Sequence, residues 1–148
     1  LKPLQNSWLK MAKRRGEQFA IADATGSKLS SQKFAAVVKT FSKKINHISK
    51  NEQNIGIVMP SSVGGAIINM ATLMIGKTVV NLNYTSNKES LKHAISMANI
   101  KTIYTSKQFM TKLKAKGFED IQETLEVANI IFVEDLKEDI KKVDVLKN

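Results

Sequence analysis

The sequence predicts an α/β fold, a mainly parallel sheet of about four βα units flanked by helices and preceded by an N-terminal helix and a β-hairpin. Short apolar runs recur around Ile55, Val79, Ile103 and Ile130. Segments with helical periodicity lie between these runs, and this alternation favours right-handed βαβ units. The 148 residues are enough for about one domain with its own core. We therefore expect a single α/β subdomain over residues 1–148.

Residues 1–16 are expected to form a docking helix. Pro3 suits the first turn of a helix, and Gly16 suits its C-terminal cap. Leu4, Trp8 and Met11 recur at helical spacing and make one short apolar stripe. A helix lying on a membrane surface is the alternative, but the shortness of the stripe favours docking on the protein itself.

Residues 17–50 are expected to form a hairpin followed by a helix. Two extended runs flank a turn that contains Gly26, a residue that tolerates the positive φ of such turns. Ser30 or Ser31 can then cap a helix. The expected buried stripe of that helix comprises Phe34, Val37, Val38, Phe41 and Ile45.

Residues 54–140 are expected to hold the repeating βα units. Strands are predicted at 55–59, 77–82, 101–105 and 129–133. Helices are predicted at 62–75, at 88–98, from Ser106 onward and at 121–127. The near-continuous apolar character of the strands is typical of a sheet covered on both faces.

Residues 54–76 contain no charged side chain and are long enough to cross a membrane. Pro60 and the pair Gly64-Gly65 interrupt this run, which favours a strand, a turn and a buried helix instead. That helix is apolar around nearly its whole circumference, so we expect it to be covered on both sides or to face a partner. Self-association through Val63–Ile75 is one expectation.

The composition limits the classes of function. There is no cysteine, and we expect neither His47 nor His93 to be a metal ligand. The formal charge of +10 comes almost entirely from scattered lysines, with two arginines and no interleaved aromatic motif. We therefore expect no nucleic-acid partner. Attraction to an anionic membrane or to an acidic carrier protein stays open.

Five residues are candidates for a binding site. Open α/β sheets bind ligands at the carboxyl ends of their strands. The candidates that follow the first two strands of the repeating units are Pro60, Ser61, Ser62, Asn83 and Tyr84. The segment Pro60–Gly65 matches neither GxGxxG nor GxxxxGK[ST], so it is not a recognisable phosphate loop. A role as turn and cap residues is the alternative for each candidate.

The order of these signals resembles the amino-terminal part of the adenylate-forming acyl-CoA and acyl-acyl-carrier-protein synthetases. FAIADATGSKLSSQKFAAVV is similar to their opening hairpin and helix, and NIGIVMPSSVGGAIINMATLMIGKTVVNLN to the strand, turn, helix and strand that follow. SLKHAISMANIKTIYTSKQF is similar to the next unit. NLNYTSNKES is particularly similar to the synthetase region of bifunctional 2-acylglycerophosphoethanolamine acyltransferases.

The resemblance implies that this chain is the scaffold part of a larger ligase. Such an enzyme activates a fatty acid with ATP and Mg²⁺ to an acyl-adenylate and passes the acyl group to CoA or a carrier protein. The family's Ser/Thr/Gly-rich phosphate loop, adenine and ribose motifs and catalytic lysine have no counterpart here. The resemblance therefore implies no catalytic residue and no cofactor in this chain itself. Its implied partners are the remainder of the polypeptide, a fatty acid, and CoA or a carrier protein.

We expect the protein to be cytoplasmic, with peripheral attachment of the full-length protein to the inner membrane as a further possibility. Two other classes of function stay open. One is a stand-alone α/β module that binds a nucleotide or a partner protein. The other is a domain that binds a membrane surface or an acidic partner through its lysines.

Overall fold

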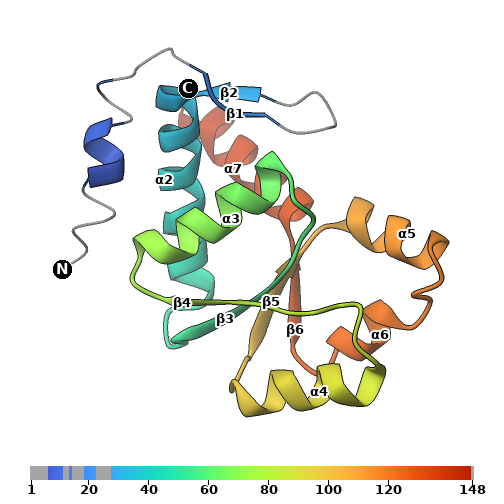
Figure 1. Ribbon diagram of the computed structural model, residues 1–148. Helices are drawn as coiled ribbons and strands as arrows, with labels where there is room; N and C mark the ends of the chain where they lie inside the picture. Colours follow the sequence, from blue (N-terminus) through green and yellow to red (C-terminus); the bar gives the residue numbers. More distant parts are fainter. Residues whose placement is uncertain (1–6, 12–13, 15–18, 23–27, 148) are drawn as a thin grey trace. The chain divides into compact units, whose positions relative to one another are not determined.

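The computed structural model describes residues 7–11, 14, 19–22 and 28–147 (Figure 1). These residues fall into two compact units. Unit 1 comprises Leu1–Lys50 and Ser61–Thr78, and unit 2 comprises Asn51–Pro60 and Val79–Asn148. Unit 1 holds the hairpin and two helices, and unit 2 holds most of a four-stranded sheet with its remaining helices.

The predicted hairpin is confirmed by an antiparallel pair in unit 1. Strand β1 (Phe19–Ala22) pairs with β2 (Lys28–Ser30), and the register shifts between Phe19 and Ile21. The predicted turn residue Gly26 lies outside the described residues, as do Pro3 and Gly16 of the expected N-terminal helix. Residues 7–11 and 14 are helical.

Helix α2 (Ser31–Ile48) follows β2 directly, as predicted. The Ser30 hydroxyl accepts a hydrogen bond from the Lys33 N–H at 3.2 Å, which satisfies one of the free donors of the first turn. The buried stripe includes Phe34, Val38, Phe41 and Ile45. The Trp8 ring meets the Phe34 ring edge to face, with centroids 5.6 Å apart. The cationic side of the helix is turned to solvent.

Helix α3 (Val63–Met74) packs against α2 within unit 1. Val63, Ile68 and Ala71 are buried, whereas Leu73 is 36% exposed and the other apolar side chains are half-buried. The helix therefore has a covered side and a partly open side, and its self-association stays a prediction. Among the described residues, no helix has both the length and the apolar character that crossing a membrane requires.

The sheet has the order β4-β3-β5-β6 (Figure 1). Its strands are β3 (Asn54–Val58), β4 (Thr78–Asn81), β5 (Thr102–Thr105) and β6 (Asn129–Phe132). β5 pairs in parallel with β3 on one side and with β6 on the other. All four predicted strands are confirmed, and so is the parallel α/β class.

The helices of unit 2 are α4 (Lys88–Met97), α5 (Lys107–Ala115), α6 (Ile121–Leu125) and α7 (Val133–Lys147). Asn87 caps α4, and the predicted cap Ser106 accepts a hydrogen bond from the Phe109 N–H of α5. α7 is not among the elements predicted from the sequence. Its apolar positions, with Leu136 buried and Ile140 half-buried, are too few among the charged residues to stand out.

The core of unit 2 lies between the sheet and the helices α4, α5 and α6. Gly56 of β3 is needed for close packing in this core. A Cβ atom at this position would lie 2.9 Å from the Ile100 Cγ2 and 2.9 Å from the Ile103 Cγ1. Real carbon atoms do not approach so closely, so only glycine lets these two side chains pack on β3.

The substitution Gly56→Ala should lower the free energy of unfolding by about 1–3 kcal/mol, because the new methyl overpacks the core. Urea denaturation followed by circular dichroism measures this. Ile100→Ala serves as the matched background, since it removes one of the two clashing carbon atoms. The cost of Gly56→Ala should be smaller in that background. Equal costs in both backgrounds would show that the clash with Ile100 is not the cause.

Candidate functional site

The three candidates that follow β3 are turn and cap residues in the structure. Ser62 is the N-cap of α3, and its hydroxyl accepts a hydrogen bond from the Gly65 N–H at 3.0 Å. Pro60 is half-buried and Ser61 is exposed. Ser61 and Ser62 belong to unit 1 and Pro60 to unit 2. The capping bond gives the Ser62 hydroxyl a structural role at the start of α3.

Asn83, which follows β4, organises the turn into α4. Its Oδ1 accepts hydrogen bonds from the Thr85 N–H at 3.1 Å and the Thr85 hydroxyl at 2.5 Å. Its carbonyl accepts a further bond from the Ser86 hydroxyl at 2.6 Å. This is the local side-chain bonding that lets asparagine stabilise a turn. The structure thus gives Asn83 a conformational role.

Tyr84, a residue predicted from the sequence, lines a pocket in unit 2. Its ring packs edge to face on Phe109, with centroids 5.2 Å apart, and on Phe118, with centroids 6.2 Å apart. The pocket lies wholly within unit 2 and has a volume of about 270 Å³. Leu91 and Ile121 supply buried apolar walls. The Tyr84 ring therefore packs against two other aromatic rings and also forms one wall of the pocket.

The lining of this pocket carries both signs of charge, because it includes Lys88, Glu119 and Asp120. The Lys88 amine is 3.9 Å from a carboxylate oxygen of Glu123, and both side chains are substantially exposed. An exposed pair at that distance adds little stability. The pocket is open and mixed in charge, and it suits a small polar molecule better than a fatty acyl chain.

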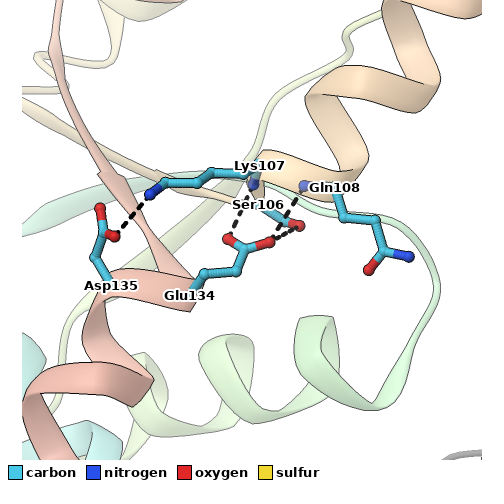
Figure 2. A network of polar contacts seen from close by, with 5 residues as sticks. All are labelled: Ser106, Lys107, Gln108, Glu134 and Asp135. Carbon is cyan, nitrogen blue, oxygen red and sulfur yellow. Dashed lines mark hydrogen bonds and ion pairs between the residues drawn. The ribbon is translucent and has the colours of Figure 1, made fainter.

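A polar network occupies the carboxyl ends of β5 and β6 (Figure 2). Glu134, in the first turn of α7, points at the beginning of α5. Its carboxylate accepts hydrogen bonds from the Ser106 hydroxyl at 2.8 Å, the Lys107 N–H at 2.9 Å and the Gln108 N–H at 3.2 Å. The chain thus places its own anion where helix N–H groups attract negative charge.

The electrostatics of Glu134 follow from these contacts. Partial burial by itself would raise the pKa of the carboxyl, because it disfavours the charged form. Hydrogen bonds from the N–H groups of Lys107, Glu134 itself and Gln108, and from Ser106, outweigh burial and hold the pKa below its usual value of 4.5. Glu134 is therefore ionised at neutral pH and is a poor general base.

An ion pair between Lys107 and Asp135 lies beside Glu134 and joins the same two helices. The Lys107 amine lies 2.8 Å from the Asp135 carboxylate (Figure 2) and 5.6 Å from the centre of the Phe132 ring. The hydrogen bond that the Lys107 amine donates to Asp135, together with the negative charge of that carboxylate, raises the pKa of Lys107 and so favours its protonated, non-nucleophilic form. Both contacts join the start of α5 to the end of β6 and the start of α7.

Metal chemistry gains no support from these residues. In the part of the chain that the structure describes, no three His, Cys, Asp or Glu side chains are grouped so that they could hold a metal ion. Mg²⁺ commonly keeps several waters and is held by one or two carboxylates together with substrate phosphates. The finding therefore concerns only a site built from three or more described side chains.

The family of the chain follows from its sequence match. Residues 9–147 match the model of the AMP-binding enzyme family. The chain belongs to this family. This membership covers both units, from the N-terminal helical residues to the end of α7.

Solved structures of the same fold agree with this membership. VinN matches with a TM-score of 0.76 at 15% identity, over 94% of this chain and 35% of VinN. O-succinylbenzoate coenzyme A synthetase from Bacillus subtilis, solved in complex with AMP, matches with a TM-score of 0.69 at 16% identity, over 88% of this chain and 32% of that protein. The chain thus spans about a third of these proteins' length.

A third match indicates which part of a ligase this fold corresponds to. The N-terminal subdomain of Klebsiella oxytoca NpsA, in complex with 3-hydroxybenzoyl-AMSN, matches with a TM-score of 0.63 at 16% identity. The match covers 69% of this chain and 26% of that one. This AMP-binding family chain therefore has the fold of the N-terminal subdomain of an adenylate-forming ligase.

Two features of the structure were not predicted from the sequence. The pocket walls at Phe118 and Ile121 follow α5, far from Tyr84 along the chain. The Glu134 network lies at the third and fourth strands of the parallel sheet, whereas the predicted site used only the first two. The acidic pair Glu134-Asp135 directly after the fourth apolar run was a usable signal, because it marks the same edge of the sheet.

Glu134→Gln should lower the free energy of unfolding at pH 7 by about 1 kcal/mol, the range for losing a helix cap. The pKa of Glu134 is lowered by folding, so its contribution is complete above about pH 4.5 and is lost as pH falls through the folded-state pKa. The difference from wild type should therefore shrink below pH 4.5. Denaturant unfolding across pH 3–7 tests this. The exposed Glu126→Gln is the control, and an equal effect there would refute a specific role for Glu134.

Tyr84→Phe should leave stability within about 0.5 kcal/mol, whereas Tyr84→Ala should cost about 2–3 kcal/mol because it removes two ring contacts and opens the wall. Thermal unfolding of both variants gives the comparison. If the phenylalanine variant lost as much as the alanine variant, the hydroxyl rather than the ring would carry the role.

Proposed function

We propose that this chain is the N-terminal scaffold of an ATP-dependent ligase that converts a carboxylic acid to an acyl-adenylate and then to an acyl thioester. The observation that carries the proposal is the family match over residues 9–147, together with the fold shared with an N-terminal ligase subdomain. The hydrogen bonds of Glu134 support a scaffold role, because they join the start of α5 to the start of α7.

The finer proposal is a fatty acyl substrate, delivered to a carrier protein or CoA and then to lysophospholipid. It is supported by the similarity of NLNYTSNKES, residues 81–90, to acyl-acyl-carrier-protein synthetases. In the structure this segment forms the end of β4, the Asn83 turn and the start of α4. ATP and Mg²⁺ belong to this proposal for the full-length enzyme, as do a cytoplasmic location and contact with the remainder of the polypeptide.

The described residues limit where the chemistry of that enzyme can take place. The Lys107 and Gln108 N–H groups at the start of α5 already donate hydrogen bonds to Glu134. We therefore assign no step of adenylation to this chain. Its role in the proposal is to hold a preformed sheet edge and to supply surface against which the catalytic segments of the ligase pack.

A small binding module is the second candidate, and the pocket beside Tyr84 favours it. Its volume of about 270 Å³ and its mixed charge suit a small polar ligand. This candidate makes a different prediction, because binding would then occur in the 148-residue chain without any added segment.

The 148-residue chain should show no fatty-acid-dependent exchange of pyrophosphate into ATP above the level of a buffer control. The same chain, followed in frame by a segment with the family's phosphate loop and catalytic lysine, should show exchange. Isotope exchange measures both. Exchange by the short chain alone would contradict the scaffold role. Ligand-induced thermal stabilisation of the short chain, abolished by Lys88→Gln, would favour the binding module.

A further inference from the structure

The net positive charge of this protein comes from one of its two compact units. Unit 1 contains 12 Lys and Arg against 2 Asp and Glu, a formal charge of +10. Unit 2 contains 11 Lys and 11 Asp and Glu, a formal charge of zero. The two units have nearly equal numbers of basic residues, so the excess of positive charge on unit 1 comes from its shortage of Asp and Glu. The excess on unit 1 therefore points to an anionic partner for that unit.

Several of the basic residues of unit 1 lie on helix α2, which is labelled in Figure 1. Its 18 residues include four lysines and no Asp or Glu, and Lys50 follows directly after its end. Lys33, Lys39, Lys43 and Lys50 are exposed. Lys33 to Lys43 extend over about 15 Å along the helix axis, and Lys50 follows the C-cap Ser49. We call these four residues the α2 lysine face.

The α2 lysine face makes no ion pair with another described residue. The exposed positions between them are small or polar, such as Ala36, Thr40 and Asn46. The large hydrophobic side chains exposed on the described surface are Leu73, Met97 and Val127, and none of them lies on α2.

The chemistry of the face favours a bilayer over other anionic partners. A protein interface would use aromatic, Met or Arg anchors, and single-stranded nucleic acid would use aromatic platforms and Arg. The exposed α2 surface has neither. Lysine is a point charge on a flexible stem, which suits diffuse attraction to many headgroups rather than bidentate recognition of one phosphate.

We propose that the α2 lysine face binds the surface of an anionic phospholipid bilayer. This goes beyond the proposed ligase function and does not depend on it, because the contact needs only the charge distribution of unit 1. Without an apolar side chain to insert, attachment is electrostatic and reversible. It should weaken as salt shortens the Debye length to about 10 Å at 0.1 M and below that at higher concentrations.

Vesicle co-sedimentation of the 148-residue chain tests the proposal. The chain should sediment with vesicles made of equal parts phosphatidylcholine and phosphatidylglycerol, and it should stay in solution with phosphatidylcholine alone. Each lysine near an anionic surface contributes about a fivefold factor in affinity. Replacing all four lysines of the face by glutamine should therefore weaken binding by more than about a hundredfold.

A matched control removes the same charge from unit 2. It replaces four exposed lysines, namely Lys101, Lys112, Lys114 and Lys116, by glutamine. This control should lose less than about fivefold, the contribution of a single surface lysine. Glutamine and lysine have similar helix propensities, so both proteins should keep the wild-type circular dichroism. If the fourfold α2 variant does not fold, Lys33→Gln/Lys39→Gln and Lys43→Gln/Lys50→Gln should each weaken binding by about 25-fold.

Three results would overturn the proposal. The first is a wild-type chain that does not sediment with phosphatidylglycerol vesicles at low salt. The second is an equal loss in the α2 and control variants, which would make the attraction a property of net charge alone. The third is tight binding to soluble polyglutamate, competing fully with vesicles, which would identify an acidic polypeptide as the partner. None of these outcomes bears on pyrophosphate exchange, so the ligase proposal is tested separately.

Discussion

Burial of the central strand β5 on both faces is the constraint on which unit 2 depends. All four of its residues, Thr102–Thr105, are buried, and it pairs in parallel with β3 and with β6. A buried strand must satisfy every polar atom it carries. The Thr105 hydroxyl therefore donates to the Val58 carbonyl at 2.7 Å, and the Thr102 hydroxyl donates to Glu52 at 2.9 Å. These two bonds tie both ends of β5 to β3 and its flank.

The same constraint determines what happens at the carboxyl edge of the sheet. Ser106 and the first N–H groups of α5 follow β5 at that edge, and Glu134 follows β6 and lies beside them. In many α/β proteins this is where an anionic ligand binds. Here the Glu134 carboxylate takes that place, and its hydrogen bonds join the β5–α5 junction to the β6–α7 junction. The edge has thereby become a structural element, in keeping with a scaffold role.

The two units differ in what they offer to the surroundings. Unit 2 has a neutral charge balance, a closed core and an open pocket beside Tyr84. Unit 1 has a strongly cationic helix and, in α3, an apolar helix with a partly open side. A chain that spans about a third of its matched ligase structures has surfaces of both kinds available for contacts. Apolar surface favours permanent packing, and cationic surface favours reversible contact with anions.

Local sequence by itself determined the order and type of most elements. Apolar runs separated by helical periods predicted four strands, and Ser30 and Ser106 were recognisable as helix caps because capping is a contact between neighbours in sequence. A binding role for the candidates Ser62 and Asn83 stays a prediction, and only the coordinates show that their side-chain oxygens accept local hydrogen bonds.

Tertiary structure decided everything that depends on residues distant in the chain. Glu134 reaches Ser106 across 28 positions, and Tyr84 meets Phe109 and Phe118 from another βα unit. Helix α7 also escaped prediction, since its Leu136 is identified as a core residue only by its neighbours in the fold. The physical reason is the same in each case. Periodicity and capping are set by adjacent residues, whereas pockets, networks and close approaches such as that at Gly56 arise only when separate elements pack together.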